Sequence, residues 1–239
     1  MSDDEIIKQA IAYAKKIKKS FAKGIVDSLP EEASAVSVFM AGSPGAGKTE
    51  TARHMINSFK ENQKLALVHI ENDEYRKEFE HYQGHNSPLF QKAATLLVEA
   101  VHDRVLRRKV SFLLDSTLSS FDKARSNIER SIRKSRYVLI IFVYQEPEQA
   151  WRLVKAREKI EGRRVPADVF VDQFLKSQEV VSKLKAEFKE NIDIIFIEKN
   201  IDGTSKKPQF NVTDIDIILN KKYNRASLET IAGINEEQK

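Results

Sequence analysis

The sequence contains no cysteine among its 239 residues. Disulfide bonds, thiol nucleophiles and thiolate metal sites are therefore excluded. No apolar run approaches the ~20 residues that a membrane-spanning helix needs. The first residues, MSDDEIIKQAIAYAKK, are charged from the third onward and lack the apolar core of a secretory signal. We therefore expect no membrane partner and a cytoplasmic location.

Histidine is also scarce, and the two that come closest to a metal-ligand pair, His81 and His85, bracket a glycine that is typical of a loop. We expect no histidine-based metal site there. The net charge of +5 is a modest basic excess that could suit an anionic ligand or nucleic acid. Basic and aromatic residues do not alternate as they do in a nucleic-acid groove, so nucleic acid is not the expected partner.

What the sequence does contain is an alternation of apolar runs and helical patterns. Strands are predicted at 35–41, 65–70, 110–115, 137–143 and 192–198. Helices are predicted at 3–28, 48–60, 88–108, 120–134, 147–160 and 167–189, with a hairpin or loop and a last short helix after 200. Near-continuous apolar strands separated by helices indicate a parallel sheet covered on both faces. We expect an N-terminal amphipathic helix and linker (1–34), an α/β core (35–200) and a polar C-terminal extension (201–239).

The residues 42–49, GSPGAGKT, match the phosphate-binding loop motif GxxxxGK[ST] in full, between a predicted strand and a predicted helix. We therefore predict a P-loop NTPase fold with a sheet of about five strands. Lys48 is expected to reach the β and γ phosphates of ATP, and the Thr49 hydroxyl to bind Mg²⁺. The predicted nucleotide-binding residues are Gly42, Ser43, Pro44, Gly45, Ala46, Gly47, Lys48, Thr49 and Glu50.

A kinase needs an acceptor-side base, a carboxylate near Mg²⁺ and mobile arginines, and the sequence offers candidates for each. Asp73 follows the second predicted strand, where ligands of open parallel sheets bind, and could take a proton from an acceptor hydroxyl. The alternative is that Asp73 only caps a short helix. Asp115 ends the third strand and could hold Mg²⁺ or contact the acceptor; Thr117 could share that cleft or cap a turn.

A basic segment over about 152–166 follows the fourth predicted strand, where small P-loop kinases carry a lid over the phosphates. Such a lid excludes water from the reaction. Arg157, Arg163 and Arg164 are the candidates for phosphate contacts, although a charged run can also be a solvated helix face.

The stretches AGSPGAGKTE, HIENDEYR, EAVHDRVL, SFLLDST and KAREKIEGRRVP together resemble the zeta toxin family, P-loop kinases described as acting on UDP-N-acetylglucosamine. The resemblance covers about residues 36–198. It implies that Asp73 is the base for the sugar 3'-hydroxyl and that Glu99, Asp115 and Thr117 contact the sugar substrate. It also implies that Arg157 and either Arg163 or Arg164 engage ATP phosphates. Asp115 departs from the glutamate found at this place in the family, which shortens its reach by one methylene.

The sequence thus predicts an ATP- and Mg²⁺-dependent kinase that phosphorylates a hydroxyl of a UDP-amino sugar. A kinase for a nucleoside, an antibiotic or a polynucleotide end is an alternative, as is a non-catalytic nucleotide-dependent binding module. The family resemblance implies a separate antitoxin partner that blocks the ATP site. The N-terminal helix could play that part within the chain, or it could be a stabilising extension.

Overall fold

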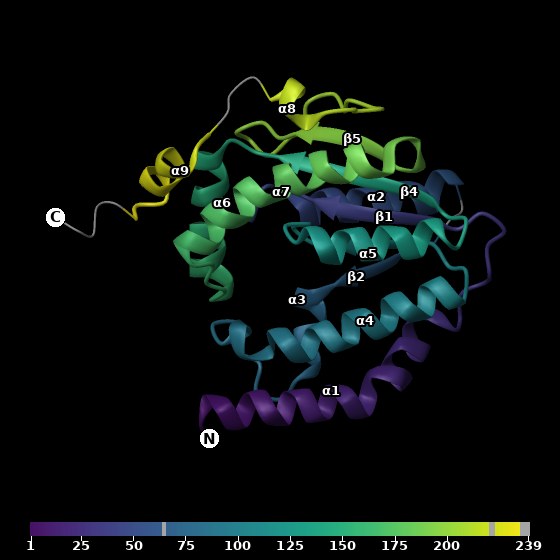
Figure 1. The fold of residues 1–239 in the computed structure, drawn as a ribbon. Coiled ribbons are helices and arrows are strands. Elements are labelled where there is room, and N and C mark those ends of the chain that lie inside the picture. The colour runs from purple at the N-terminus through teal and green to yellow at the C-terminus, as the bar shows by residue number, and fades with distance from the viewer. Residues whose placement is uncertain (64–65, 220–222, 235–239) are drawn as a thin grey trace.

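The computed structural model describes residues 1–63, 66–219 and 223–234. Within them, five strands form one sheet in the order β2-β3-β1-β4-β5, and each neighbouring pair is parallel (Figure 1). The strands are β1 (Val36–Ala41), β2 (Val68–Glu71), β3 (Phe112–Asp115), β4 (Tyr137–Tyr144) and β5 (Asp193–Glu198). The predicted parallel sheet of the P-loop NTPase fold is confirmed.

The helices are α1 (Asp3–Val26), α2 (Lys48–Gln63), α3 (Asn72–Tyr75), α4 (Gln91–Arg107), α5 (Phe121–Ile132), α6 (Pro147–Glu161), α7 (Ala167–Phe188), α8 (Ile215–Ile218) and α9 (Arg225–Ile231). Three short 3-10 segments accompany them, η1 (Arg76–Glu78), η2 (Ser87–Phe90) and η3 (Lys189–Asn191).

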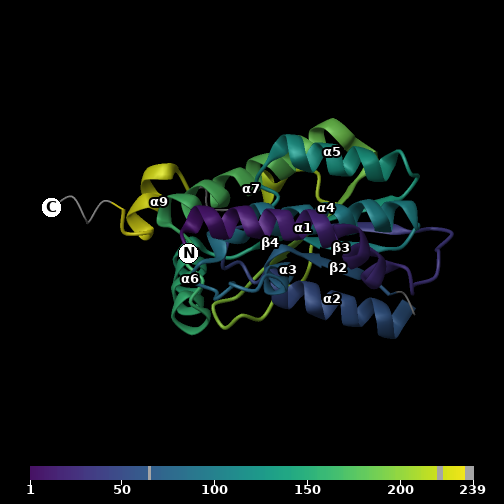
Figure 2. The same cartoon turned by 90° about the horizontal axis from the view of Figure 1, so that it is seen from below.

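Helices cover both faces of the sheet, and each strand contributes side chains to both, because alternate residues of a strand point to opposite sides. In β1, Phe39 packs in the cluster shared with α1, α4, α5 and α7, whereas Val38 and Met40 pack in the cluster shared with α2. Figures 1 and 2 show α4, α5 and α7 on one side of the sheet and α2 on the other. The sheet is therefore a rigid layer whose carboxyl ends all point toward one edge, and the loops at that edge carry the candidate site.

The predicted N-terminal helix is present as α1 and packs along the outer side of α4 (Figure 1). A capping box at Ser2 and Glu5 and three acidic residues in the first turn stabilise its start. Near its end, Asp27 accepts a hydrogen bond from Arg104 Nε at 2.6 Å. The ring of Phe21 lies edge-on to Tyr75, with centroids 4.9 Å apart. The helix thus supports the short segment that follows β2.

Several element boundaries differ from the sequence expectations by a few residues, among them the starts of one helix and one strand of the core. The helix expected at 88–108 begins as the 3-10 segment Ser87–Phe90 and becomes α-helical only at Gln91. The strand expected at 65–70 starts at Val68, where its ladder with Phe112 of β3 begins; residue 65 lies outside the described residues. As an edge strand, β2 has one neighbour, so its length is set by β3 and not by its own apolar run.

The segment after 200 folds back on β5 through antiparallel bridges between Phe196 and Gln209 and between Lys199 and Ser205. The hairpin-like return expected there is present, and two short helices, α8 and α9, follow it among the described residues.

Candidate active site

The loop between β1 and α2 is built around three glycines with positive φ, Gly42, Gly45 and Gly47. A Cβ atom on Gly42 would lie 2.2 Å from the backbone oxygen of Val143, and one on Gly45 would lie 2.1 Å from that of Ala150. Only glycine fits such close backbone approaches together with a left-handed conformation. The loop is therefore held tightly against the end of β4 and the first turn of α6.

Lys48, the first residue of α2, folds back over this loop. Its Nζ donates hydrogen bonds to the carbonyl oxygens of Gly42 and Ser43, at 3.0 and 2.7 Å. Among the described residues, no carboxylate lies within ion-pair distance of Nζ. Burial lowers the pKa of Lys48 to about 8, and the nearby Arg163 contributes in the same direction. The loop thus carries a cation without a close counter-ion, an arrangement that an anionic ligand would stabilise.

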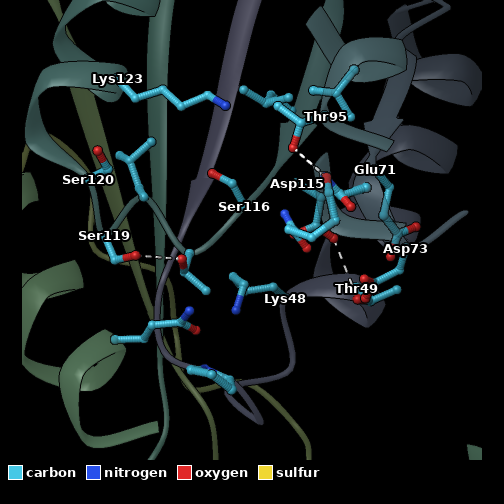
Figure 3. Close-up of a pocket in the computed structure, with 18 of the residues that line it drawn as sticks. Lys48, Thr49, Glu71, Asp73, Thr95, Asp115, Ser116, Ser119, Ser120 and Lys123 are labelled. Carbon is cyan, nitrogen blue, oxygen red and sulfur yellow. Dashed lines mark hydrogen bonds between the residues drawn. The ribbon is translucent and has the colours of Figure 1, made fainter. Parts of the chain in front are cut away.

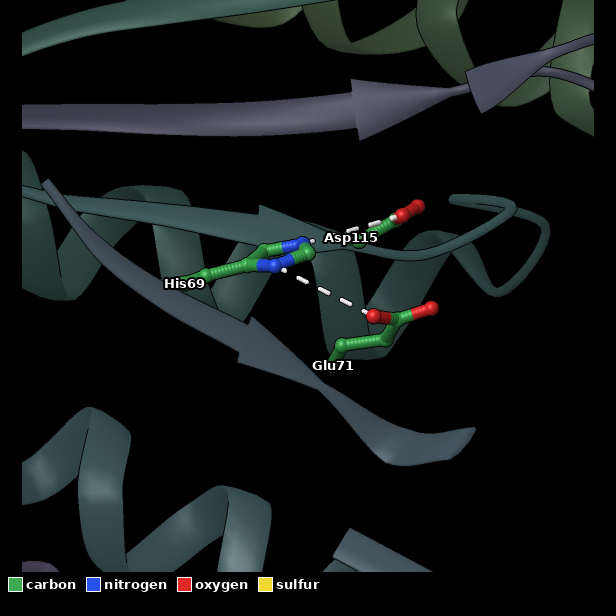
Figure 4. A group of neighbouring side chains, drawn as sticks. All are labelled: His69, Glu71 and Asp115. Carbon is green, nitrogen blue, oxygen red and sulfur yellow. Dashed lines mark ion pairs between the residues drawn. The ribbon is translucent and has the colours of Figure 1, made fainter. Parts of the chain in front are cut away.

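Beside the loop, Thr49 Oγ1 donates a hydrogen bond to Asp115 Oδ2 at 3.5 Å. Asp115 ends β3, and the parallel register places Glu71, at the end of β2, directly beside it. His69 completes the group: its Nδ1 lies 3.9 Å from Glu71 Oε2, and its Nε2 lies 3.9 Å from Asp115 Oδ2 (Figure 4). Burial raises the pKa of Glu71, and the charge of Asp115 raises it further.

Hydroxyl and carboxylate oxygens are the ligands that Mg²⁺ prefers. Thr49 and Asp115, with Glu71 and His69 behind them, therefore fit a divalent cation at the edge of the loop. The fit rests on the oxygen donors of Thr49, Asp115 and Glu71, which lie together at this edge.

Asp73 lies in the first turn of α3, immediately after β2, and lines the cleft (Figure 3). The N-cap of that helix is Glu71, and it makes no side-chain capping bond. The Asp73 carboxylate instead forms ion pairs with two arginines, Arg76 of η1 and Arg163 of the segment between α6 and α7. Asp73 thus has the position expected of an acceptor-side base, and its role remains a prediction.

The predicted lid consists of α6 and the turn after it, and its three arginines have different settings. Arg163 reaches across the cleft to Asp73. Arg157 Nε lies 3.6 Å from Glu161 Oε1 on its own helix. The side chain of Arg164 is 76% exposed, and its Nε lies 3.9 Å from Glu158 Oε1. All three line the cleft, but Arg163 is the one that faces the acceptor side.

The end of the lid also touches the loop before η2. A Cβ atom on Gly84 would lie 2.6 Å from the backbone oxygen of Glu161, and one on Gly162 would lie 3.5 Å from the backbone nitrogen of His85. The end of the lid and this loop are therefore in close contact.

The opposite wall of the cleft is formed by α4, α5 and the loop after β3. Glu99 Oε1 of α4 lies 3.7 Å from Lys123 Nζ of α5. The hydroxyls of Thr117 and Ser119 are hydrogen-bonded at 2.9 Å (Figure 3). Together with the P-loop and the lid, these elements enclose one cavity of about 1020 Å³. Its size is at the upper end of the ~300–1,000 Å³ typical of ligand pockets, which leaves room for two substrates.

The structure brings most of the predicted residues into this one cavity, with four exceptions in and beside the phosphate-binding motif. Gly42, Ser43 and Ala46 are buried and do not line the cavity, and Glu50 is exposed outside its lining. Among the residues that sequence reasoning missed at the cleft or at its candidate metal-binding edge are Arg76, Lys123, Glu71 and His69. A signal existed for Arg76, which follows Asp73 by three residues in a helical pattern and therefore shares its face.

Three comparisons with known proteins can be set against this geometry. A family model described as "Zeta toxin" matches residues 22–208 of the chain. The comparison with curated proteins finds no match.

Among solved structures, the chain resembles one from the PezAT chromosomal toxin-antitoxin system of Streptococcus pneumoniae. The TM-score is 0.60 and the identity 17%, over 98% of this chain and 95% of that one. It also resembles a structure of AvrRxo1-ORF1:-ORF2 with ATP, with a TM-score of 0.59 and 13% identity over 90% of this chain and 70% of that one. At these identities the likeness shows a shared fold.

Proposed function

Because the chain belongs to the zeta toxin family, we propose that it is an ATP- and Mg²⁺-dependent kinase that phosphorylates a hydroxyl of UDP-N-acetylglucosamine. The family and the P-loop fold carry the coarser part of this statement, a nucleotide-binding, kinase-like protein related to toxins of toxin-antitoxin systems. The acceptor, the metal and the roles of individual residues are the proposal.

One observation carries it. A single cavity joins the P-loop lysine, the Thr49–Asp115 pair, the lid arginines and Asp73. A protein that only binds a nucleotide needs the loop, but it has no use for a carboxylate facing the loop across the cleft or for arginines that reach this carboxylate. These groups suit phosphoryl transfer, in which catalysis is mostly positioning and charge stabilisation.

In the proposed reaction Asp73 accepts the proton of the acceptor hydroxyl, whose oxygen then bonds to the γ phosphorus of ATP. The bond between the γ phosphorus and the β–γ bridging oxygen breaks, and its electron pair leaves with ADP. Lys48 and Arg157 neutralise the charge that develops on the phosphoryl oxygens. Thr49 and Asp115 would hold a Mg²⁺ ion, which would supply positive charge to the nucleotide phosphates. The lid excludes water, which would otherwise compete with the sugar hydroxyl.

The acceptor wall supports a UDP-sugar in two ways. Glu99, Asp115 and Thr117 offer carboxylate and hydroxyl groups for sugar hydroxyls. Lys123 places an ammonium group in the same wall, where it could contact the diphosphate of the acceptor. A nucleoside, an antibiotic and a polynucleotide end are the alternative acceptors that the experiment below compares.

We also propose that the chain acts in the cytoplasm and has a separate antitoxin as partner. The similar PezAT structure comes from a toxin-antitoxin system. No helix in the described part of the chain is long and apolar enough to cross a membrane. Among the described residues, α1 contributes none to the cleft lining and lies on the outer side of α4, which favours a stabilising extension over a cis-inhibitor of the ATP site.

The test is the release of ADP from ATP and Mg²⁺ in the presence of each candidate acceptor. We expect UDP-N-acetylglucosamine to stimulate ADP release, and Asp73→Asn to abolish this stimulation because the amide cannot accept the proton. Asp122→Asn is the matched control, since Asp122 is exposed in the first turn of α5 and does not line the cleft. Stimulation by a different acceptor alone would reject UDP-N-acetylglucosamine, and equal rates in wild type and Asp73→Asn would reject Asp73 as the base.

A further inference from the structure

The two arginines that contact Asp73 hold different oxygens of its carboxylate and come from different parts of the fold. Arg76 Nη1 pairs with Oδ1, and Arg163 Nη1 pairs with Oδ2. Both oxygens of the proposed base are therefore occupied in this structure. Each oxygen keeps a second lone pair, but an acceptor hydroxyl that approached Oδ2 would have to share this oxygen with the Arg163 guanidinium.

Arg76 is fixed in the body of the protein. Its side chain is 7% exposed, and its second terminal nitrogen, Nη2, donates a hydrogen bond to Oε1 of Gln91, the first residue of α4. The preceding residue, Tyr75, is buried, and its hydroxyl donates a hydrogen bond to the His69 carbonyl at 3.3 Å. Arg76 thus links the Asp73 segment to the start of α4 and cannot follow a movement of the lid.

Arg163 has no comparable support. It lies in the irregular segment between α6 and α7, and its side chain is 30% exposed. It faces a cleft that also contains Lys48 and Arg157, and both of these cations are candidates for phosphate contacts. Nucleotide phosphates in this cleft would compete with Asp73 for the Arg163 guanidinium.

We propose that Arg76 is a positioning residue for the phosphoryl transfer: it holds Oδ1 of Asp73, so that Oδ2 takes the acceptor proton once Arg163 has moved to the nucleotide. This inference rests on the proposed kinase function and assigns different roles to the two arginines that contact Asp73. Arg76 orients the carboxylate throughout the reaction, and Arg163 covers the reactive oxygen only while no nucleotide is bound.

The physical reason is geometric. A carboxylate that loses its fixed partner rotates about its terminal torsion, which has a broad, two-fold energy profile. Misplacement of a reacting group by about 1 Å can lower the rate by about 10²-fold. Loss of Arg76 is therefore expected to affect the chemical step and to leave the nucleotide site, on the far side of the cleft, unchanged.

The experiment compares Arg76→Gln with Lys77→Gln. The matched control removes the neighbouring cation, whose side chain is 63% exposed and pairs with Glu74 at 2.7 Å. We would measure kcat and KM for UDP-N-acetylglucosamine, the dissociation constant for ATP by calorimetry, and the melting temperature.

For Arg76→Gln we expect kcat to fall by about 10²-fold, with the ATP dissociation constant within about twofold of wild type. Arg76→Lys should recover part of kcat, and Lys77→Gln should behave as wild type.

A fall in melting temperature with kcat unchanged would show a purely structural role and overturn the inference. If Arg76→Gln does not fold, Arg76→Lys and Gln91→Leu decide: lower kcat with unchanged ATP affinity supports the inference, and wild-type kcat in both overturns it. An inactive wild type that still binds ATP would overturn the proposed function itself, and the role of Arg76 with it. Normal wild-type turnover together with normal Arg76→Gln turnover would overturn the inference alone.

Discussion

The charge state of Lys48 leads to a quantitative prediction for nucleotide binding. In the empty loop its ammonium has two carbonyl acceptors, and burial lowers its pKa to about 8. ATP phosphates need the protonated lysine as their partner, and they would raise the pKa of Lys48 in the complex. The affinity for ATP should therefore be constant below about pH 8 and decline as the pH rises through that value.

The size of the effect follows from the fraction of chains that carry the proton. At pH 9, one unit above the pKa of Lys48, about one tenth of the empty chains carry the ammonium. The apparent dissociation constant for ATP equals the intrinsic one divided by that fraction. It should therefore be about tenfold higher at pH 9 than at pH 7. Above pH 8 binding should also take up a proton, since the complex keeps the lysine charged.

The assay is calorimetric titration with ATP and Mg²⁺ at several pH values from 7 to 9.5, without an acceptor. Lys48→Arg should bind more weakly but with a flat pH dependence, because a guanidinium stays charged throughout this range. Lys155→Met, which removes a lysine of α6 that does not line the cleft, should keep the wild-type profile. A wild-type affinity that stays constant to pH 9.5 would refute the reasoning.

Two further predictions concern the loop and the N-terminal helix. Gly45→Ala should abolish detectable ATP binding in the same titration, because the new Cβ would lie 2.1 Å from the backbone oxygen of Ala150. The control Gly24→Ala, where nothing lies within 4 Å of the new Cβ, should bind ATP normally and gain about 0.5–1 kcal/mol of stability. Phe21→Ala should cost about 2 kcal/mol, less than the ~3–5 of a fully buried phenylalanine, and lower the melting temperature by about 4–8 °C. The control Phe210→Ala, at a side chain that is 65% exposed, should change the melting temperature little. A rise in the kinase activity of Phe21→Ala would instead favour cis-inhibition by α1.

The sequence allowed the fold to be predicted because its strongest signals are local. The apolar runs of β1, β4 and β5 and the glycine motif before Lys48 each specify their own structure within a few residues. The position of Asp73 followed from the same logic, since the residue after a parallel strand lies at the ligand-binding edge.

The remaining features of the site depend on contacts between distant segments. Glu71 joins the Thr49–Asp115 pair only because β2 lies beside β3 with Glu71 opposite Asp115, a register that no local pattern shows. The different settings of Arg163 and Arg164 depend on the path of the backbone after Gly162, because Arg163 pairs with Asp73 whereas the side chain of Arg164 is mostly exposed. The link from Asp73 through Arg76 to Gln91 spans a turn whose shape comes from tertiary packing.

The most direct test of the central claim is ³¹P NMR of the purified protein with ATP, Mg²⁺ and UDP-N-acetylglucosamine. The account predicts a new phosphomonoester resonance that grows as ADP forms and stays absent with Asp73→Asn. ADP and free phosphate alone, or no turnover of ATP with any of the acceptors, would contradict it.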